Sequence, residues 1–334
     1  MIAEINDDWK KWIFENLIEG HGLESIVSVM VEKGFDLEVA KTEVISTSQS
    51  PYLDSAQKYY KKLLKRNKMA TVVDMFARMD PDFTKIERIP IPPFQEFIIK
   101  YLSKSRPVIL QGAINNWKAK DWDFDYLKKT VGNKMIEIQD KRESNKNFEP
   151  EKGLHNAPIK FSDFIDRITS VDSSNDAYLT AYNTKQFRES IKSLFDDLGN
   201  IGQNGDSYVA ADAIKDSCHL WIGPKGTITP LHCDEMNIIF TQIKGSKRYM
   251  MYPPSQSAYV YDTNYVYSDV NVLDLDQNLH PEFNKALGIE FVINEGEVLF
   301  IPAYWWHHVT SLEPSISVSF TSVNVPNNYN SLVV

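Results

Sequence analysis

Residues 219–252, HLWIGPKGTITPLHCDEMNIIFTQIKGSKRYMMY, place two side chains of the metal-binding kind, His232 and Asp234, one residue apart. In an extended strand successive side chains alternate between the two faces, so these two positions project to the same side. An imidazole and a carboxylate that face the same way can hold one metal ion. Such a pair needs a third ligand, which a distant strand must supply.

The strongest candidate for that third ligand lies in a second tryptophan-rich stretch, GEVLFIPAYWWHHV, at residues 296–309. An apolar run ends there in His307 and His308. Strand alternation sends these two histidines to opposite faces, so only one of them can reach the metal. Two histidines and one carboxylate on one face of a metal leave the opposite coordination positions open, which is typical of non-haem Fe(II) oxygenases.

Residues 86–323 resemble the JmjC and cupin-like 2-oxoglutarate oxygenases. The similarity is carried by WIGPKGTITPLHCDE (221–235), by its ungapped continuation to IKGSKRY (243–249), and by GEVLFIPAYWWHHV followed by SISVSF (315–320). Within this family, the chain is similar to the asparaginyl hydroxylase that inhibits hypoxia-inducible factor and to JmjC arginyl hydroxylases. The resemblance implies a mainly β fold, in which a double-stranded β-helix (jelly-roll) core carries flanking helices and an N-terminal helical region.

The resemblance also implies an iron site, with Fe(II) as cofactor and 2-oxoglutarate as cosubstrate, and no catalytic side chain beyond the metal ligands. In this arrangement Lys247 faces inward from the start of its strand. A buried ammonium without a partner is strongly disfavoured, and an incoming dicarboxylate would supply that partner. The residues carried over are the metal ligands His232, Asp234 and His307, and the 2-oxoglutarate contacts Lys247, Thr229 and Tyr178.

The substrate pocket departs from the family pattern at several positions. Ile238 stands where some relatives have an asparagine, and Thr321 replaces an aromatic residue. At Ser319 the asparaginyl hydroxylase has an asparagine, whereas the arginyl hydroxylases have a serine. We predict that Trp221, Tyr182 and Ser319 contact the substrate.

Two regions outside the motifs are expected to select the substrate. Residues 140–157 are polar and without periodicity, which is typical of an exposed loop, and loops on a rigid scaffold commonly carry specificity. Residues 253–291 form a tyrosine-rich insertion. It either shapes a peptide-binding groove or covers the edge of the barrel, since tyrosine combines contact area with a hydrogen-bonding tip. Earlier in the chain, residues 177–182 predict a strand that carries Tyr178 and Tyr182.

Helices are expected throughout residues 7–80, which carry none of the oxygenase motifs. Apolar residues recur there at three- and four-residue spacing, and residues 7–46 predict a three-helix module. The module either binds a partner peptide, or packs on the main domain or forms a dimer contact. The prolines of RIPIPPF at 88–94 then favour an extended connection. We therefore predict an N-terminal helical region at 1–82 and an oxygenase domain at 83–334.

Net charge, cysteine count and the absence of long apolar runs exclude several classes of protein. The chain has 334 residues, a formal net charge of −9 and only two cysteines, Cys218 and Cys233. Net acidity opposes nucleic-acid binding, and two cysteines exclude a disulfide framework and suit a reducing compartment. No apolar run is long enough for a membrane span, and the N-terminus lacks the layout of a signal peptide. We expect a cytoplasmic protein, a monomer or a homodimer, without nucleic-acid or membrane partners.

The function implied by the resemblance is that of an Fe(II)- and 2-oxoglutarate-dependent dioxygenase. It would hydroxylate a side chain of a protein or peptide while 2-oxoglutarate and O2 become succinate and CO2. Three alternatives stay open. A JmjC-type N-methyl demethylase would share the iron site, a tRNA-base hydroxylase would require affinity for RNA, and a non-enzymatic metal-bearing cupin or binding module would use the barrel as a scaffold.

Overall fold

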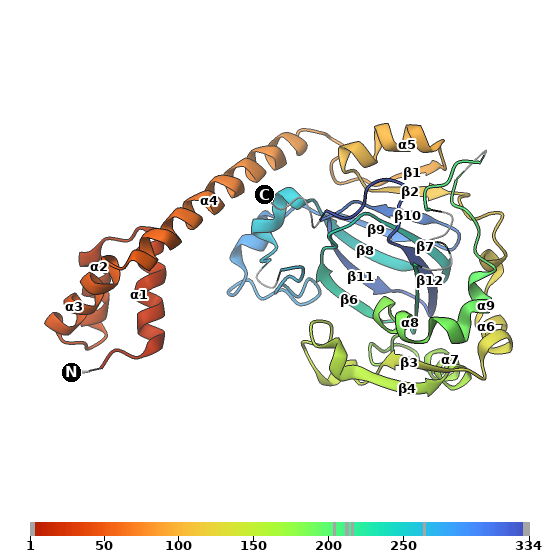
Figure 1. Ribbon diagram of the computed structural model, residues 1–334, viewed down its shortest axis with the longest axis horizontal. Helices are drawn as coiled ribbons and strands as arrows, with labels where there is room; N and C mark the ends of the chain where they lie inside the picture. The colour runs from red at the N-terminus through yellow and green to blue at the C-terminus, as the bar shows by residue number, and fades with distance from the viewer. Residues whose placement is uncertain (1–3, 203–204, 211–213, 215–216, 263–264, 330–334) are drawn as a thin grey trace. The chain divides into compact units, whose positions relative to one another are not determined.

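The computed structural model describes residues 4–202, 205–210, 214, 217–262 and 265–329. The chain divides into two compact units between Met75 and Phe76. The first unit is helical, and the second is built around β-sheets (Figure 1). Within the described residues, no helix is both long enough and apolar enough to cross a membrane.

The N-terminal unit is a small group of helices around its own apolar core. Ile13, Met30 and Ala40 are fully buried there, as the three- and four-residue spacing of the apolar residues predicts. The side chains of Asn6 and Asp36 cap two of the helices by accepting hydrogen bonds from backbone amides of the first turn. The helices are α1 (Asp7–Glu19), α2 (Leu23–Glu32), α3 (Leu37–Ser48) and α4 (Pro51–Ala77).

The second unit contains two large sheets whose inner faces pack against each other. The order of strands in the larger sheet is β1 (Glu87–Pro90), β2 (Val108–Gln111), β10 (Val298–Ile301), β7 (Ile238–Lys244), β12 (Ser315–Phe320) and β5 (Cys218–Gly223). The order in the smaller sheet is β6 (Ile228–His232), β11 (Trp306–Ser311), β8 (Lys247–Tyr252) and β9 (Ile289–Ile293). All pairs in both sheets are antiparallel except β1 with β2.

From β5 onward the chain passes repeatedly from one sheet to the other, which is the winding of a double-stranded β-helix. Strands β5, β7, β10 and β12 belong to the larger sheet, and β6, β8, β9 and β11 belong to the smaller one. Apolar side chains such as Phe240 of β7 and Tyr249 of β8 meet between the sheets, with ring centroids 5.9 Å apart. The predicted fold class, a mainly β jelly-roll core with flanking helices, is confirmed.

The continuous apolar run in β7 is explained by burial on both faces of the larger sheet. Ile238 and Phe240 face the smaller sheet, whereas Ile239 and Ile243 face a layer of helices. A strand that is covered on both sides has no polar face to show in its sequence. The helices of that layer, visible outside the sheet in Figure 1, are α5 (Phe94–Lys100), α6 (Phe124–Val131), α7 (Phe161–Ser170) and α9 (Lys192–Phe195).

The strand predicted at residues 177–182 is wrong in its second half. Tyr178 and Leu179 pair only through isolated bridges, and Tyr182 lies in a helix, α8 (Ala181–Phe187). The hydroxyl of Thr180 donates a hydrogen bond to the side chain of Asn183 at 2.9 Å, inside the first turn of that helix. Tyr178 and Tyr182 therefore belong to different elements and reach the same region from different directions.

The prediction of an exposed loop at residues 140–157 is also wrong in part. Arg142 is fully buried, and Glu149 and His155 are more than nine-tenths buried. The segment contains two short 3-10 helices, η3 (Arg142–Ser144) and η4 (Lys152–His155). It connects β3 (Met135–Gln139) to β4 (Asn156–Lys160), which form a separate two-stranded sheet.

Candidate metal centre

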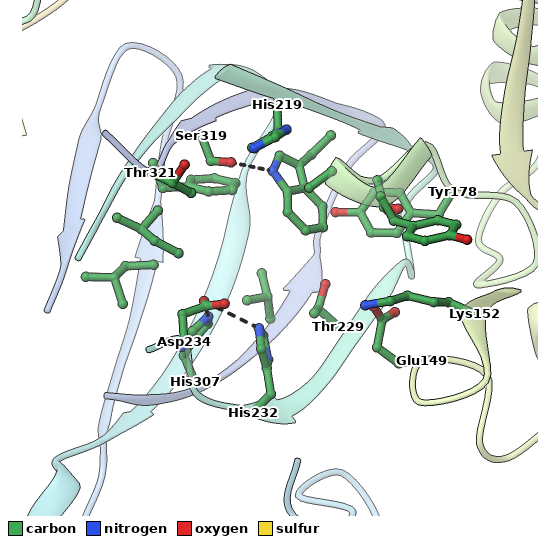
Figure 2. A pocket seen from close by; sticks show the side chains of 18 of the residues that line it. Glu149, Lys152, Tyr178, His219, Thr229, His232, Asp234, His307, Ser319 and Thr321 are labelled. Atoms are coloured by element: carbon green, nitrogen blue, oxygen red, sulfur yellow. Dashed lines mark hydrogen bonds and ion pairs between the residues drawn. The ribbon is translucent and has the colours of Figure 1, made fainter. Parts of the chain in front are cut away.

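Two neighbouring strands of the smaller sheet bring three ligand-type side chains together. His232 ends β6, Asp234 follows two residues later, and His307 lies directly opposite His232 on the antiparallel strand β11. One donor atom from each residue lies within 4.8 Å of the other two. The Oδ2 atom of Asp234 is 3.4 Å from Nε2 of His307 and 3.8 Å from Nε2 of His232 (Figure 2).

The orientation of both imidazoles fits a bound cation. Nδ1 of His232 lies 2.8 Å from the carbonyl oxygen of Pro230, and Nδ1 of His307 lies 2.9 Å from that of Trp305. When Nδ1 donates to a carbonyl, the Nε2 lone pair is left for a metal. Two nitrogens and one carboxylate form a donor set that suits Fe(II), and the open side of the triad faces a cavity.

Strand alternation separates the two adjacent histidines. His307 lines the cavity, whereas His308 is almost as deeply buried but does not line it. Burial, followed by the nearby His232, lowers the pKa of His307 to about 4, so its ring is neutral at neutral pH, as a metal ligand must be. The structure brings His307, and not His308, to the pair, and metal binding by this triad remains a prediction.

A cavity of about 410 Å³ extends between the two sheets from the triad to Lys247. The Lys247 side chain is almost completely buried, and its Nζ atom donates a hydrogen bond to the hydroxyl of Tyr178 at 3.1 Å. Thr229 lines the same cavity beside Tyr178. The three residues predicted to contact 2-oxoglutarate thus lie together in one wall of the cavity.

Lys247 has no ion-pair partner in the described part of the chain. The ammonium group lies 5.3 Å from the ring centroid of Phe240 and 5.4 Å from that of Tyr178, and no carboxylate of the described residues shifts its pKa. Burial alone lowers the pKa of Lys247 to about 7. A buried cation without a counter-charge is unfavourable, so the geometry suits an anionic ligand that enters the cavity.

Gly223 of β5 leaves the space that Tyr178 occupies. A Cβ atom at this position would lie 2.7 Å from Cδ2 of Tyr178 and 2.7 Å from the hydroxyl of Thr227. Any larger residue would therefore push Tyr178 away from Lys247. The glycine of the quoted motif WIGPKG thus has a steric role that the sequence does not reveal.

The three residues predicted to contact the substrate all line the cavity. Nε1 of Trp221 donates a hydrogen bond to Oγ of Ser319 at 2.8 Å, across the paired strands β5 and β12. The ring of Trp221 also lies against that of Tyr178, with centroids 5.9 Å apart. Tyr182 approaches from α8. Their contact with a substrate stays a prediction.

Several residues that line the cavity were not predicted. His219 shares a strand face with Trp221, so alternation within β5 is a signal that could have identified it. Its Nδ1 atom has no hydrogen-bond partner among the described residues, and burial, followed by Arg188 and Lys185, lowers its pKa to about 4. No pattern in the sequence marks the others, which come from residues 140–157, from α8 and from the tyrosine-rich insertion: Glu149, Lys152, Lys185 and Tyr267.

Arg142 attaches the segment 140–157 to the wall of the cavity. Its buried guanidinium donates to the carbonyl oxygen of Ile228 at 2.8 Å and to Oδ1 of Asn175 at 2.8 Å. It also lies 5.1 Å from the ring centroid of Tyr178 and pairs with Glu149 at 3.3 Å. Because Ile228 begins β6, one side chain connects this segment, a ligand-bearing strand and Tyr178.

Replacing Arg142 by methionine is expected to lower the free energy of unfolding by about 3–5 kcal/mol, because Glu149 would remain buried without its partner. Urea unfolding followed by tryptophan fluorescence measures this change. Adding Glu149→Gln to the same variant removes the unpaired charge and is expected to recover part of the loss. A loss below about 1 kcal/mol for the single variant would show that the pair is not what holds this wall.

The chain is similar to one protein family and to several curated proteins. The family described as Cupin-like domain matches residues 93–322. The chain is 28% identical over 254 residues to "Lysine-specific demethylase 8" of Xenopus tropicalis, covering 71% of this chain and 52% of that protein. It is 31% identical over 239 residues to "Lysine-specific demethylase JMJ30" of Arabidopsis thaliana, covering 67% and 51%. It is 31% identical over 253 residues to "JmjC domain-containing protein D" of Dictyostelium discoideum, covering 70% and 55%. The chain thus spans about half the length of the curated relatives it matches.

Proposed function

This chain belongs to the cupin-like, JmjC-type family of Fe(II)- and 2-oxoglutarate-dependent oxygenases, and on that basis we propose that it oxidises a side chain of a protein or peptide. The family membership confirms the resemblance seen in the sequence. The cofactors are those of the family, Fe(II) and 2-oxoglutarate, and the His232, Asp234 and His307 side chains suit the metal.

One observation carries the proposal: a ligand triad and an uncompensated buried lysine share one cavity. Neither feature stabilises the apo protein by itself, because the triad gathers a carboxylate and two imidazoles, and Lys247 lacks a counter-ion. Both become favourable when a divalent cation and a dicarboxylate occupy the cavity together. A binding module without a small-molecule ligand would need neither of them.

The residues of the chain would act by holding and shielding the reactants. His232, Asp234 and His307 would hold Fe(II), and Lys247, Tyr178 and Thr229 would receive the C5 carboxylate of 2-oxoglutarate. Bound Fe(II) supplies the oxidative chemistry, in which 2-oxoglutarate and O2 yield succinate and CO2 and one oxygen atom is transferred to the substrate.

The chain also controls what reaches the reacting atoms. Phe240 and Ile301 present apolar surface from the larger sheet, and Val309 does so from the smaller one. These side chains exclude water from the cavity, which strengthens every electrostatic contact made inside it. Trp221, fixed by its hydrogen bond to Ser319, would help to place the substrate.

We propose hydroxylation of a side-chain carbon as the outcome. Demethylation of an N-methyl group is the second candidate, because two of the relatives reported above are named lysine-specific demethylases. The two reactions share the same site and differ in the fate of the oxidised carbon, since a hydroxylated N-methyl group releases formaldehyde. Net acidity argues against a tRNA base as the substrate.

The proposal is tested on digested proteome peptides incubated with the Fe(II)-loaded protein, 2-oxoglutarate and O2. We expect peptides that gain the mass of one oxygen atom, and succinate in equal amount, only when His232 and Asp234 are intact. Formaldehyde released from methylated peptides, without a stable gain of oxygen, would assign demethylation instead. Absence of succinate with every peptide pool would leave a non-enzymatic metal-bearing cupin, and affinity for RNA at low salt would favour the tRNA-base alternative.

The cellular setting and the oligomeric state complete the proposal. Cys218 and Cys233 are both buried, and a count of only two cysteines in 334 residues supports a reducing compartment such as the cytoplasm. A monomer and a homodimer both accommodate a site formed by one chain.

A further inference from the structure

We propose that one end of the cavity, the cationic wall formed by Lys152, Tyr182 and Lys185, binds an acidic side chain of the peptide substrate close to the residue that is oxidised. This inference rests on the proposed function, because it assigns a substrate class to the same site. The occupant is a carboxylate, from aspartate or glutamate, and not the cosubstrate.

The cationic wall is assembled from two segments that are distant in sequence. Lys152 comes from η4, and its Nζ atom lies 5.8 Å from the ring centroid of Tyr182 in α8. Lys185 follows Tyr182 by one turn of α8, so the two side chains share a helix face. All three residues line the cavity that contains the triad.

The positive charge of this wall is compensated only in part within the cavity. Glu149 and Asp234 are the carboxylates among the described residues that line it. Glu149 lies beside Lys152, at 4.0 Å, but its closer partner is the buried Arg142 at 3.3 Å (Figure 2). Asp234 belongs to the ligand triad and would be neutralised by the metal.

Both lysines keep donors available for a ligand. Lys152 donates one hydrogen bond, to the hydroxyl of Tyr267 at 3.4 Å, and an ammonium has three N–H groups. In the described part of the chain, Lys185 takes part in no hydrogen bond or ion pair, and its side chain is exposed. A carboxylate placed between them would gain a charge-assisted hydrogen bond from each.

The positive charge of Lys185 also lowers the pKa of a nearby histidine, His219. The pKa of His219, on the adjoining wall, is lowered first by burial and then by Arg188 and Lys185. This local excess of positive charge occurs in a chain whose formal net charge is −9, so it is a property of the site and not of the protein as a whole. The field attracts an acidic substrate segment and repels a basic one.

The cosubstrate has its own cation elsewhere in the cavity. Lys247 is buried beside Tyr178 and Thr229, whereas Lys185 is exposed at the rim. Two lysines at the rim therefore remain available after 2-oxoglutarate has bound. Because 2-oxoglutarate is also a carboxylate, the test must separate binding of the peptide from binding of the cosubstrate.

The test measures peptide binding without turnover. The Fe(II)-loaded protein is kept under argon with saturating 2-oxoglutarate, and fluorescence anisotropy follows two labelled peptides of one glycine–serine–asparagine scaffold. One peptide carries glutamates beside the central asparagine and the other carries lysines. At about 50 mM salt we expect the glutamate peptide to bind at least about tenfold more tightly, and we expect the difference to shrink as salt is added.

Variants of the two lysines locate the effect. Lys152→Gln and Lys185→Gln are each expected to weaken binding of the glutamate peptide about three- to fivefold, as is usual for a partly exposed charge pair. Lys185→Glu is expected to turn the preference toward the lysine peptide. Lys192→Gln removes an exposed lysine of α9 that pairs with Glu189 at 3.3 Å outside the cavity, and it is the matched control.

Three results would overturn the inference. The first is equal affinity for the two peptides, and the second is an unchanged preference in the Lys152→Gln/Lys185→Gln double variant. The third is a raised KM for 2-oxoglutarate with unchanged peptide affinity, which would assign the lysines to the cosubstrate.

A protein that prefers the glutamate peptide but never forms succinate keeps this inference and loses the proposed function. A protein that forms succinate but binds the two peptides equally keeps the proposed function and loses this inference.

Discussion

Asp234→Ala is expected to reduce 2-oxoglutarate turnover by more than about 100-fold while the fold stays intact. Residues that only orient a metal ligand commonly contribute about 10–100-fold to metal affinity or activity, so loss of a ligand should exceed that range. Among the described residues, the ion pairs of the Asp234 side chain are those with the two histidines, at 3.4 and 3.8 Å. Its backbone oxygen accepts a hydrogen bond from the amide of Tyr304 at 2.7 Å, and alanine keeps this bond.

Succinate formation measures the effect of Asp234→Ala, and far-UV circular dichroism checks the fold. Glu235→Gln is the matched control, because this carboxylate adjoins Asp234 in sequence, bonds to the hydroxyl of Tyr265 and does not line the cavity. We expect the control to turn over 2-oxoglutarate at nearly the rate of the unmodified protein. If Asp234→Ala retained more than a tenth of the activity, the triad would not be the metal site.

Lys247→Met is expected to abolish the response to 2-oxoglutarate and to make the apo protein more stable at neutral pH. Methionine fills similar space without the cost of a buried ammonium. Burial lowers the pKa of Lys247 from 10.5 to about 7. Each pKa unit corresponds to about 1.4 kcal/mol, so the native apo protein carries a penalty of a few kcal/mol at neutral pH.

The lowered pKa of Lys247 also sets the direction in which the stability of the apo protein changes with pH. Between about pH 7 and pH 10.5 the unfolded chain holds a proton on Lys247 that the folded chain has lost. The unfolded state therefore binds more protons, and the contribution of this group to stability rises with pH across that window. Below about pH 7 both states are protonated, and the penalty is constant. The free-energy difference between Lys247→Met and the unmodified protein should shrink as pH rises from 7 to 10.

Urea unfolding at a series of pH values measures this difference, and the midpoint of thermal unfolding with and without 2-oxoglutarate measures ligand binding. Lys244→Met is the matched control, since Lys244 ends the preceding strand, β7, is 41% exposed and pairs with Glu295 at 3.0 Å. We expect 2-oxoglutarate to raise the midpoint of the control but not that of Lys247→Met. An apo Lys247→Met variant less stable than the unmodified protein at pH 7, or one that still responds to 2-oxoglutarate, would contradict the assignment.

The core of the site was predictable because strand alternation is a local rule. It predicts that His232 and Asp234 project to one side, although β6 ends at His232 and Asp234 lies just beyond it. It also sends His307 and His308 to opposite sides of their strand. The register of β6 and β11 then puts His307 directly opposite His232. The family resemblance implies an inward-facing Lys247, which is buried as expected.

Local rules failed where distant contacts decide the conformation. A polar composition suggests an exposed loop at 140–157, yet Arg142 is buried because partners from other segments, Asn175 and Ile228, satisfy its guanidinium. The apolar and aromatic residues of 177–182 suggest a strand, yet Tyr182 lies in α8. Side chains of α8 make tertiary hydrogen bonds as well, from Asn183 to Asn156 at 3.1 Å and from Thr184 to the carbonyl oxygen of Leu220 at 3.2 Å. In both cases tertiary hydrogen bonds outweigh the average preference of the residues.

The amino-acid sequence by itself determined the jelly-roll core, the ligand triad and the inward-facing lysine, because these depend on alternation along single strands and on motifs that the family shares. Only the tertiary structure decided which other side chains form the cavity. Lys152, Tyr182 and Lys185 meet there because chain topology brings η4 beside α8, and Tyr267 joins them from the insertion. Residues that are far apart in sequence and meet in one wall leave no periodic pattern along the chain. The charge of that wall can therefore be seen only in the folded structure.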